Sequence, residues 1–251
     1  MSVSPPIVLA FAASDPTGGA GLQADVLTLA ALGCHPLSVL TAVTVQDTSG
    51  VERVQPLEAG LVEAQARALL REVRVAAFKL GVLGSAPIIR AIATIIAEHR
   101  DTPLVLDPVL ASGRGDALAD DAMIDALLES IVPRATVATP NVLEAKPLGG
   151  EKHLLERGCR YVLLTGTHAE SAEVVNRLYD ARGLVREDRW KRLEGSYHGS
   201  GCTLASAIAA SLAKGLAVPQ AVGEAQAYTW RTLAEGFRPG NGQFIPQRFV
   251  K

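Results

Sequence analysis

The stretch with the most distinctive chemistry is "HGSGCTLASAIAA", which runs from His198 to Ala210. A Gly-Ser-Gly turn leads there into small apolar residues at helical spacing. Backbone N–H groups at the start of a helix would converge on an anion such as a phosphate. Cys202 is the unexpected member, because phosphate chemistry would more naturally use a carboxylate at that place. Taken singly, a cysteine in this position is more often a small buried apolar residue.

Polar side chains follow most of the apolar runs that we interpret as strands. Gln46 ends a run rich in β-branched residues, and Asp107 ends another, with a glycine-rich loop at 111–116 after it. In open α/β sheets, ligands bind beyond the carboxyl ends of the strands. We therefore expect one cleft to be lined by the residues at these ends, which are 14–21, 46–48, Asp107, Asn141, Glu144 and 165–168.

Each of these residues also has a purely structural interpretation. The glycines of 18–21 suit a tight strand-to-helix connection, and Asp107 before a proline suits a turn. Asn141 and Glu144 suit the cap of a following helix. Gln46 suits a solvated loop.

Phosphoryl transfer is the chemistry that accommodates the whole set. It needs an anion hole for the γ-phosphate and carboxylates that organise a metal ion. Asp107 and Glu144 would hold Mg²⁺ directly or through water, since Mg²⁺ keeps several of its waters. The sequence has neither a Walker P-loop nor a kinase Gly-rich loop, so we expect another kinase architecture. The anion hole would be formed by Gly199, Ser200 and Gly201 at the start of the helix.

The elements that must position these residues alternate between short apolar runs and longer helical patterns. Such alternation predicts an α/β fold with a mostly parallel sheet covered on both faces, in one domain spanning residues 1–251. A hairpin within 173–190 is expected near the sheet edge. The predicted strands are 7–13, 37–46, 76–83, 104–110, 135–141 and 161–167. The predicted helices are 20–33, 57–73, 85–99, 120–132, 201–214 and 219–236.

Composition excludes several classes of partner. Of the 251 residues, 48% are hydrophobic and 20% charged, which suffices for a well-filled core. The net charge of −2 and an aromatic content of 4% argue against a nucleic-acid partner or an acidic membrane surface. The three cysteines are far apart and lack metal-ligand spacing. With no signal or membrane span expected, we predict a soluble cytoplasmic protein with reduced thiols.

Six stretches in order carry a family resemblance: "ASDPTGGAGLQADVLTLAALG", "TAVTVQDTSGV", "KLGVLG", "VLDPVLASGRGDAL", "ATPNVLEA" and "HGSGCTLASAIAASLAKG". Together they resemble the hydroxymethylpyrimidine/phosphomethylpyrimidine kinases of thiamine biosynthesis, in the ribokinase-like superfamily, from about residue 7 to about 235. The resemblance implies a three-layer α/β/α fold, ATP, Mg²⁺ and usually a homodimer. It also implies two phosphorylations, first of 4-amino-5-hydroxymethyl-2-methylpyrimidine and then of its monophosphate.

The resemblance also implies roles for individual residues. Gln46 matches the glutamine that holds the aminopyrimidine, and its amide offers a donor and an acceptor side by side. Cys202 matches the cysteine that stands where relatives carry an aspartate base. It would act as a thiolate, with its pKa lowered by the helix N-terminus, or through its backbone N–H. On the substrate side the matching residues are Asp25, Ala13, Gly21, Val82 and Val109, and on the nucleotide and metal side Asp107, Asn141, Glu144, Thr165 and Gly166.

Departures from the family pattern leave two alternatives open. Thr165 and Gln226 stand where the family has lysines, and the stretch between Glu144 and Tyr161 is shorter than usual. A pyridoxal kinase of the related cysteine-containing group is one alternative, against which the triplet 46–48 argues. A catalytically weakened pyrimidine-binding regulatory protein is the other, against which the retained Cys202, Asp107 and Glu144 argue.

Overall fold

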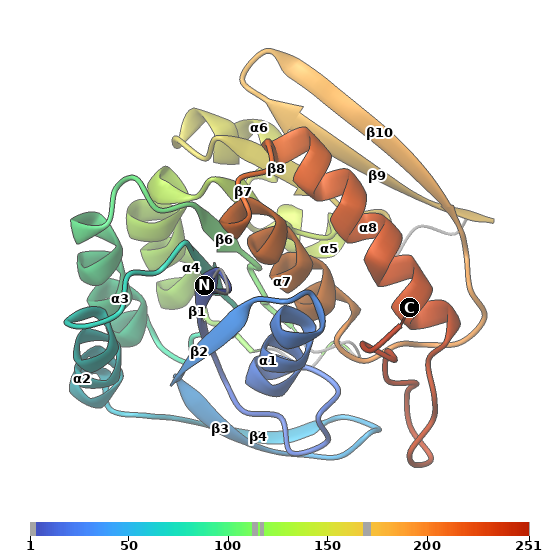
Figure 1. Ribbon diagram of the computed structural model, residues 1–251, viewed down its shortest axis with the longest axis horizontal. Helices are drawn as coiled ribbons and strands as arrows, with labels where there is room; N and C mark the ends of the chain where they lie inside the picture. Colours follow the sequence, from blue (N-terminus) through green and yellow to red (C-terminus); the bar gives the residue numbers. More distant parts are fainter. Residues whose placement is uncertain (1–3, 112–114, 116–117, 168–171, 251) are drawn as a thin grey trace.

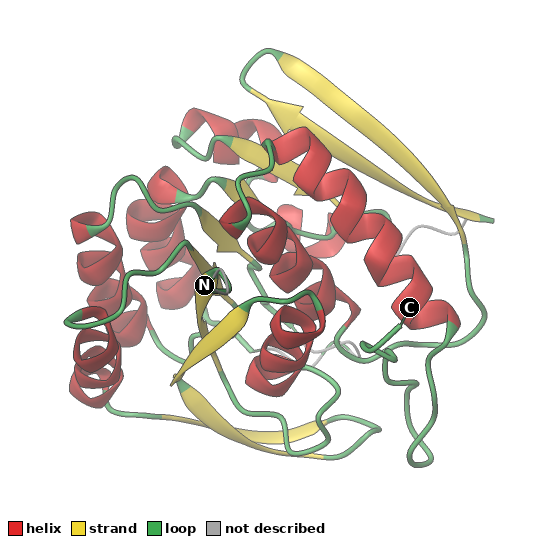
Figure 2. Cartoon of the chain, viewed as in Figure 1, coloured by secondary structure: helices red, strands yellow, loops and turns green. Residues whose placement is uncertain are grey.

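A mostly parallel sheet forms the middle layer of the protein, in a computed structural model that describes residues 4–111, 115, 118–167 and 172–250 (Figures 1 and 2). Its strand order is β10-β9-β8-β7-β6-β5-β1-β2, with only β9 and β10 antiparallel to their neighbours. The predicted α/β fold with a mostly parallel sheet is confirmed. The strands are β1 (Ile7–Ala12), β2 (His35–Leu40), β5 (Ala77–Leu80), β6 (Leu104–Leu106), β7 (Val137–Ala138), β8 (Tyr161–Leu164), β9 (Glu173–Asp180) and β10 (Gly183–Lys191).

Helices cover both faces of this sheet, because alternate residues of the central strands face two separate apolar cores. In β1, Leu9 and Phe11 pack in one core and Val8 and Ala10 in the other. Strands buried on both faces read as continuous apolar runs, which is how the sequence identified them. The first core contains residues of α2 (Ala59–Leu70), α3 (Ala86–Glu98), α4 (Asp121–Ala126) and α6 (Gly150–Glu156). The second contains residues of α1 (Gly21–Ala31), α7 (Ser200–Ala213) and α8 (Val218–Ala234).

The predicted strand 37–46 is wrong in one respect, since it is two strands in two sheets. The chain leaves the main sheet after β2, and Thr41 lies between the two strands with its hydroxyl bonded to the carbonyl of Val82. β3 (Ala42–Gln46) then pairs antiparallel with β4 (Val51–Pro56), which the sequence analysis missed. The apolar pattern runs on without a break from β2 into β3, so the sequence does not show that the chain passes from one sheet to another.

Other boundaries shift for local reasons. The expected strands 104–110 and 135–141 are shorter, as β6 and β7. The helix 120–132 is α-helical only at its start, and continues as a π-helix (Leu127–Ile131) and a 3₁₀ turn (Val132–Arg134) around Pro133. The predicted hairpin is confirmed as β9 and β10 at the sheet edge. Among the described helices, none is long and apolar enough to cross a membrane.

Phe78 of β5 is fully buried, and its ring packs against Phe11 and His99. We expect Phe78→Ala to lower the free energy of unfolding by about 3–5 kcal/mol, through lost transfer energy and the cavity left behind. Leu184→Ala is the control, since Leu184 is 56% exposed and should change stability by no more than about 0.5 kcal/mol. Urea unfolding of the purified variants measures both, and equal losses would contradict the assignment of Phe78 to the core.

Candidate active site

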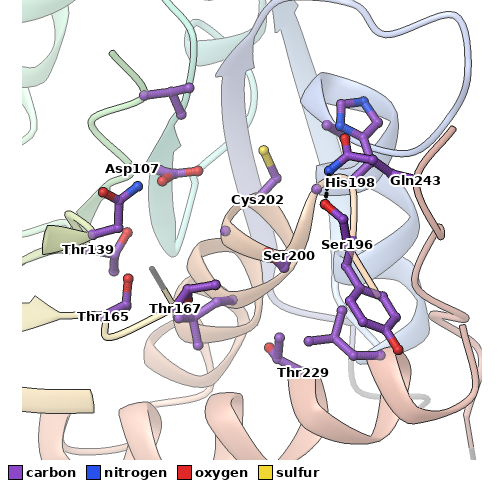
Figure 3. Close-up of a pocket in the computed structure, with 18 of the residues that line it drawn as sticks. Asp107, Thr139, Thr165, Thr167, Ser196, His198, Ser200, Cys202, Thr229 and Gln243 are labelled. Carbon is purple, nitrogen blue, oxygen red and sulfur yellow. Dashed lines mark hydrogen bonds between the residues drawn. The ribbon is translucent and has the colours of Figure 1, made fainter. Parts of the chain in front are cut away.

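A cavity of about 480 Å³ opens at the carboxyl ends of the parallel strands (Figure 3). Its walls come from the ends of β1, β5, β6, β7 and β8, from β3 and β4, and from the first turn of α7. Most of the predicted site residues line it: Ala13, Gly21, Gln46, Val82, Asp107, Val109, Asn141, Glu144, Thr165, Gly199, Ser200, Gly201 and Cys202. Asp25 and Gly166 do not, for reasons given below. Ser112, Gly113, Arg114 and Asp116 of the glycine-rich loop, and His168, lie outside the described residues.

The start of α7 has the geometry of an anion cradle. Gly199 is its N-cap, with a left-handed φ of 77°, and the helix begins at Ser200. A side chain at position 199 would overlap the carbonyl oxygen of Gly19, so only glycine fits there. The N–H groups of a first helical turn have no intrahelical acceptor, and the positive end of the helix dipole favours an anion. The residues of this turn line the cavity, and Ser200 and Cys202 are labelled in Figure 3.

Asp15 organises the loop that packs against this cradle. Its carboxylate accepts the N–H groups of Thr17 at 2.8 Å and Ala20 at 2.6 Å, and contacts Nε2 of His198 at 2.8 Å. Burial alone would raise the pKa of Asp15, but the hydrogen bonds and charge of His198 and the Ala20 N–H lower it to about 2. Asp15 therefore ties the loop after β1 to the residue that precedes the cradle.

A buried group of charges lies beneath the cavity. Nζ of Lys79, which is fully buried, is 2.7 Å from Oδ1 of Asp25 and 3.9 Å from Oδ2 of Asp107. Burial opposes the charge of Lys79, but the negative charge of Asp25 and its neighbours holds the pKa of Lys79 above its usual value. Ser206 donates a hydrogen bond to Asp25 at 2.8 Å.

The expected substrate contact of Asp25 is therefore corrected. Its side chain is 0% exposed, and both carboxylate oxygens are engaged, by Lys79 and by Ser206. Asp25 lies under the cavity wall and neutralises Lys79. Sequence matching alone could not separate a pocket aspartate from one that lies a layer deeper.

Cys202 is a neutral thiol rather than a thiolate. Burial raises the pKa of Cys202 to about 12, and the positive charge of Lys79 offsets burial only in part. The prediction of a partly ionised thiol at neutral pH is wrong, because it counted the helix N-terminus and left out burial beside Asp107. The thiol interacts with Asp107 and lowers the pKa of that carboxyl group. Its backbone N–H remains available as the other predicted contribution.

Asp107 and Glu144 fit a magnesium ion. Oδ2 of Asp107 is buried and, within the described chain, has no hydrogen-bond partner. Burial raises the pKa of Asp107 to about 6, against the charge of Lys79, and burial and then Asp107 raise the pKa of Glu144 to about 8. A buried carboxylate and a half-buried one, both with raised pKa values, would be stabilised by a cation, and Mg²⁺ takes oxygen ligands. Glu144 is also part of the capping box with Asn141, which confirms the structural interpretation of that pair.

Gln46 lies at the end of β3, on the side of the cavity formed by β3 and β4. The register of the two strands shifts beside it, since Val45 is paired with Arg53 and Gln46 with Val51. The Gln46 amide donates to Thr44 at 2.9 Å. Asp47, by contrast, accepts the N–H groups of Ser49 and Gly50 and so stabilises the turn.

The side near β8 is closed by a network of amides and indoles. Gly166 lies against the backbone of β9, its N–H donates to Asn176 at 3.0 Å, and it does not line the cavity. Gln226, 3% exposed, accepts from Asn176 and Trp190 and donates to Asp188 at 2.8 Å. The ring of Trp190 stacks on that of Trp230, with 6.4 Å between the ring centroids.

The sequence analysis missed two buried cations, Lys79 and Arg248. Lys79 interrupts the apolar run of β5, and a charge inside a buried strand is a signal that could have been used. Arg248 lies near the C-terminus, and nothing in its local sequence predicts its burial. Its exposed fraction is 2%.

Comparisons with known proteins agree with this geometry. The phosphomethylpyrimidine kinase family model matches residues 15–247. The hydroxymethylpyrimidine/phosphomethylpyrimidine kinase of Streptomyces coelicolor is 40% identical, over 96% of this chain and 93% of that protein. A crystal structure of Bacillus subtilis pyridoxal kinase with ADP superposes with a TM-score of 0.91 at 28% identity, over 98% of both chains. The phosphomethylpyrimidine kinase of Clostridium difficile 630 superposes with a TM-score of 0.77 at 31% identity, over 89% of this chain and 97% of that one.

The lowered pKa of Asp15 predicts how the site responds to acid. The folded state holds the ionised carboxylate more favourably than the unfolded chain, so the stabilisation is complete above the unfolded pKa of 3.8 and is lost as pH falls through about 2. We expect Asp15→Asn to lower the free energy of unfolding by about 2 kcal/mol at pH 6, with the difference from wild type shrinking below pH 4. Urea unfolding between pH 2.5 and pH 6 measures it, with exposed Asp101→Asn as the control for a lost charge. A difference independent of pH would contradict the assignment.

Proposed function

Because this chain belongs to the phosphomethylpyrimidine kinase family, we propose that it transfers the γ-phosphoryl group of ATP to 4-amino-5-hydroxymethyl-2-methylpyrimidine and then to the resulting monophosphate. The protein is accordingly a phosphotransferase of thiamine biosynthesis with a ribokinase-like fold. The observation that carries the proposal is that Gln46 and the cradle at Gly199–Gly201 face one cavity. The structure of the Bacillus subtilis relative contains ADP, which supports ATP as the donor.

The cavity suggests how each substrate is held. The amide of Gln46 would pair with a ring nitrogen and the adjacent exocyclic amine of the pyrimidine, while Val82 and Val109 supply apolar contacts. The hydroxymethyl group would then point towards Cys202. The N–H groups of Ser200 and its neighbours would bind the transferred phosphoryl group, whose charge they stabilise most in the transition state.

Magnesium would be held by Oδ2 of Asp107 and by Glu144, directly or through water. When bound, Mg²⁺ neutralises charge on the β- and γ-phosphates of the nucleotide. The described residues contain no group of three or more His, Cys, Asp or Glu side chains placed to bind a metal. Mg²⁺ needs no such cage, because phosphate and water complete its coordination.

Cys202 would act as a neutral group. Phosphoryl transfer passes through a loose transition state that asks mainly for positioning and charge stabilisation, so a strong base is not required. The neutral thiol interacts with Asp107, and the backbone N–H of Cys202 completes the cradle. A neutral thiol and a thiolate base predict different activities for variants of Cys202.

We also propose a single kinase domain that works in the cytoplasm as a homodimer. Val43 and Val45, each 41% exposed, stand on the β3–β4 sheet and would suit an apolar contact between copies. The three cysteines are free thiols, as a reducing compartment would keep them. The net charge of −2 supports small molecules rather than nucleic acids as partners.

Pyridoxal is the second candidate substrate, because the pyridoxal kinase of Bacillus subtilis superposes more closely than the pyrimidine kinase of Clostridium difficile 630. Identity favours the pyrimidine, at 40% for the Streptomyces enzyme against 28% for the pyridoxal kinase. An ADP-release assay with hydroxymethylpyrimidine, its monophosphate and pyridoxal side by side decides between them. We expect kcat/KM to be at least about tenfold higher for hydroxymethylpyrimidine than for pyridoxal. Higher kcat/KM with pyridoxal would reverse the assignment, and binding without turnover would favour a regulatory protein.

Two substitutions of Cys202 distinguish a neutral thiol from a thiolate. Serine keeps a neutral donor to Asp107, whereas alanine removes it and keeps only the backbone N–H. We expect Cys202→Ser to retain at least a tenth of kcat and Cys202→Ala to lose roughly 100-fold, with pyrimidine binding preserved in both. Steady-state kinetics and calorimetric titration measure these effects. Full activity in Cys202→Ala would show that the thiol has no part in the reaction.

A further inference from the structure

Arg248 is a buried cation whose contacts all lie behind the phosphate cradle. Its guanidinium donates to the carbonyls of Gly18, at 3.1 Å, and Gly19, and to the hydroxyl of Thr203 at 3.2 Å. No described carboxylate forms an ion pair with it. Burying a charge without an ionic partner is costly, so mere stability is a poor explanation for an arginine here.

The two peptide groups at Gly19 are held from both ends. The Gly18 carbonyl accepts from Arg248, while the Gly19 N–H of the same peptide plane donates to Thr17 at 3.1 Å. The Gly19 carbonyl also accepts from Arg248, while the Ala20 N–H of that plane donates to Asp15 at 2.6 Å. A peptide group is planar, so fixing its carbonyl and its N–H fixes its orientation. Consecutive glycines would otherwise have wide conformational freedom.

A second path runs from Arg248 directly into the cradle. The Thr203 hydroxyl that accepts from Arg248 donates in turn to the carbonyl of Gly199 at 2.8 Å. That carbonyl shares a peptide plane with the N–H of Ser200. The Gly199 carbonyl also accepts the Thr203 N–H at 2.9 Å, so both bonds hold it along the axis of α7 and direct the Ser200 N–H out of the N-terminal end of the helix. The Gly19 carbonyl, which Arg248 also holds, lies against Gly199 itself.

We propose that Arg248 is a positioning residue for phosphoryl transfer, which fixes the backbone of the loop at Gly18–Gly19 and of the cradle at Gly199–Ser200 in the orientation that receives the phosphoryl group. The proposal rests on the proposed kinase function for its catalytic part. Arg248 does not line the cavity, so it acts through these backbone groups and not by contact with the substrate.

The chain offers a matched control for a purely structural role. The Tyr228 hydroxyl donates to the backbone carbonyl of Arg248 at 2.7 Å, and the Gln247 N–H donates to Thr232 at 2.9 Å. Both contacts anchor the C-terminal segment without using the guanidinium. Tyr228→Phe therefore weakens the same anchor while it leaves all three side-chain bonds of Arg248 in place.

The test compares Arg248→Met with Tyr228→Phe in the full chain. We expect Arg248→Met to lower kcat by about 10- to 100-fold, because small errors in position are costly in catalysis, while the Kd for hydroxymethylpyrimidine changes less than about threefold. Hydrogen exchange followed by mass spectrometry should show at least about fivefold faster exchange of the Gly19, Ala20 and Thr203 amides, whose N–H groups are hydrogen-bonded in the wild type. Tyr228→Phe should leave kcat and this exchange within about twofold of wild type.

Unchanged kcat and exchange in Arg248→Met would overturn the proposal, as would equal losses in Tyr228→Phe. If Arg248→Met does not fold, Thr203→Val breaks only the relay to Gly199, and the same two readouts then decide. If the wild type turns over no substrate, the kinase proposal fails by itself, and exchange of the Gly19, Ala20 and Thr203 amides still tests whether Arg248 holds the two loops.

Discussion

The backbone contact between Gly19 and Gly199 is the constraint on which the rest of the site depends. The loop after β1 and the turn before α7 meet there without an intervening side chain, because a Cβ at 199 would overlap the Gly19 carbonyl. So close an approach aims the first turn of α7 at the ends of the strands, but it gains little energy by itself. It is held instead by bonds on either side of it, from Asp15 to His198 and from Arg248 to the carbonyl of Gly19. The phosphate cradle is thus a joint between two loops rather than a property of one helix.

The buried charges beneath the cavity are paired so that the negative charge of Asp107 is only partly neutralised. Lys79 is neutralised chiefly by Asp25 and lies farther from Asp107, at 3.9 Å. Asp107 therefore keeps a raised pKa and an oxygen without a hydrogen-bond partner in the described chain. Such an arrangement costs stability in the free protein, and a bound cation would relieve it. Burial, reinforced by the charges of Asp107 and Asp25, keeps Cys202 protonated, so the residue that was predicted to act as a base is an uncharged part of the wall.

The features that the sequence predicted are those that depend on residues close together in the chain. The strands, the helix starts and the Asn141–Glu144 cap depend on neighbours within a few positions, and these were predicted. The departure of β3 from the main sheet, the Lys79–Asp25 pair and the contacts of Arg248 join residues that are far apart in the chain. Burial decides their chemistry, and burial is a tertiary property. Asp25 and Cys202 show this most clearly. Both were placed near the site, but Asp25 was predicted to contact the substrate and Cys202 to be partly ionised.

The side of the cavity that we expect to bind the nucleotide has few side-chain cations. The resemblance implies a lysine at the position of Gln226, whose amide is engaged by Asn176, Trp190 and Asp188 and carries no charge. Thr165 likewise brings none. An anion that meets fewer side-chain cations must rely more on aligned backbone N–H groups and on the positive end of α7. Backbone dipoles act only over short distances and in fixed directions, whereas a lysine can follow its ligand. This chain should therefore be less tolerant of disorder in the joint between Gly19 and Gly199 than a relative that keeps both lysines.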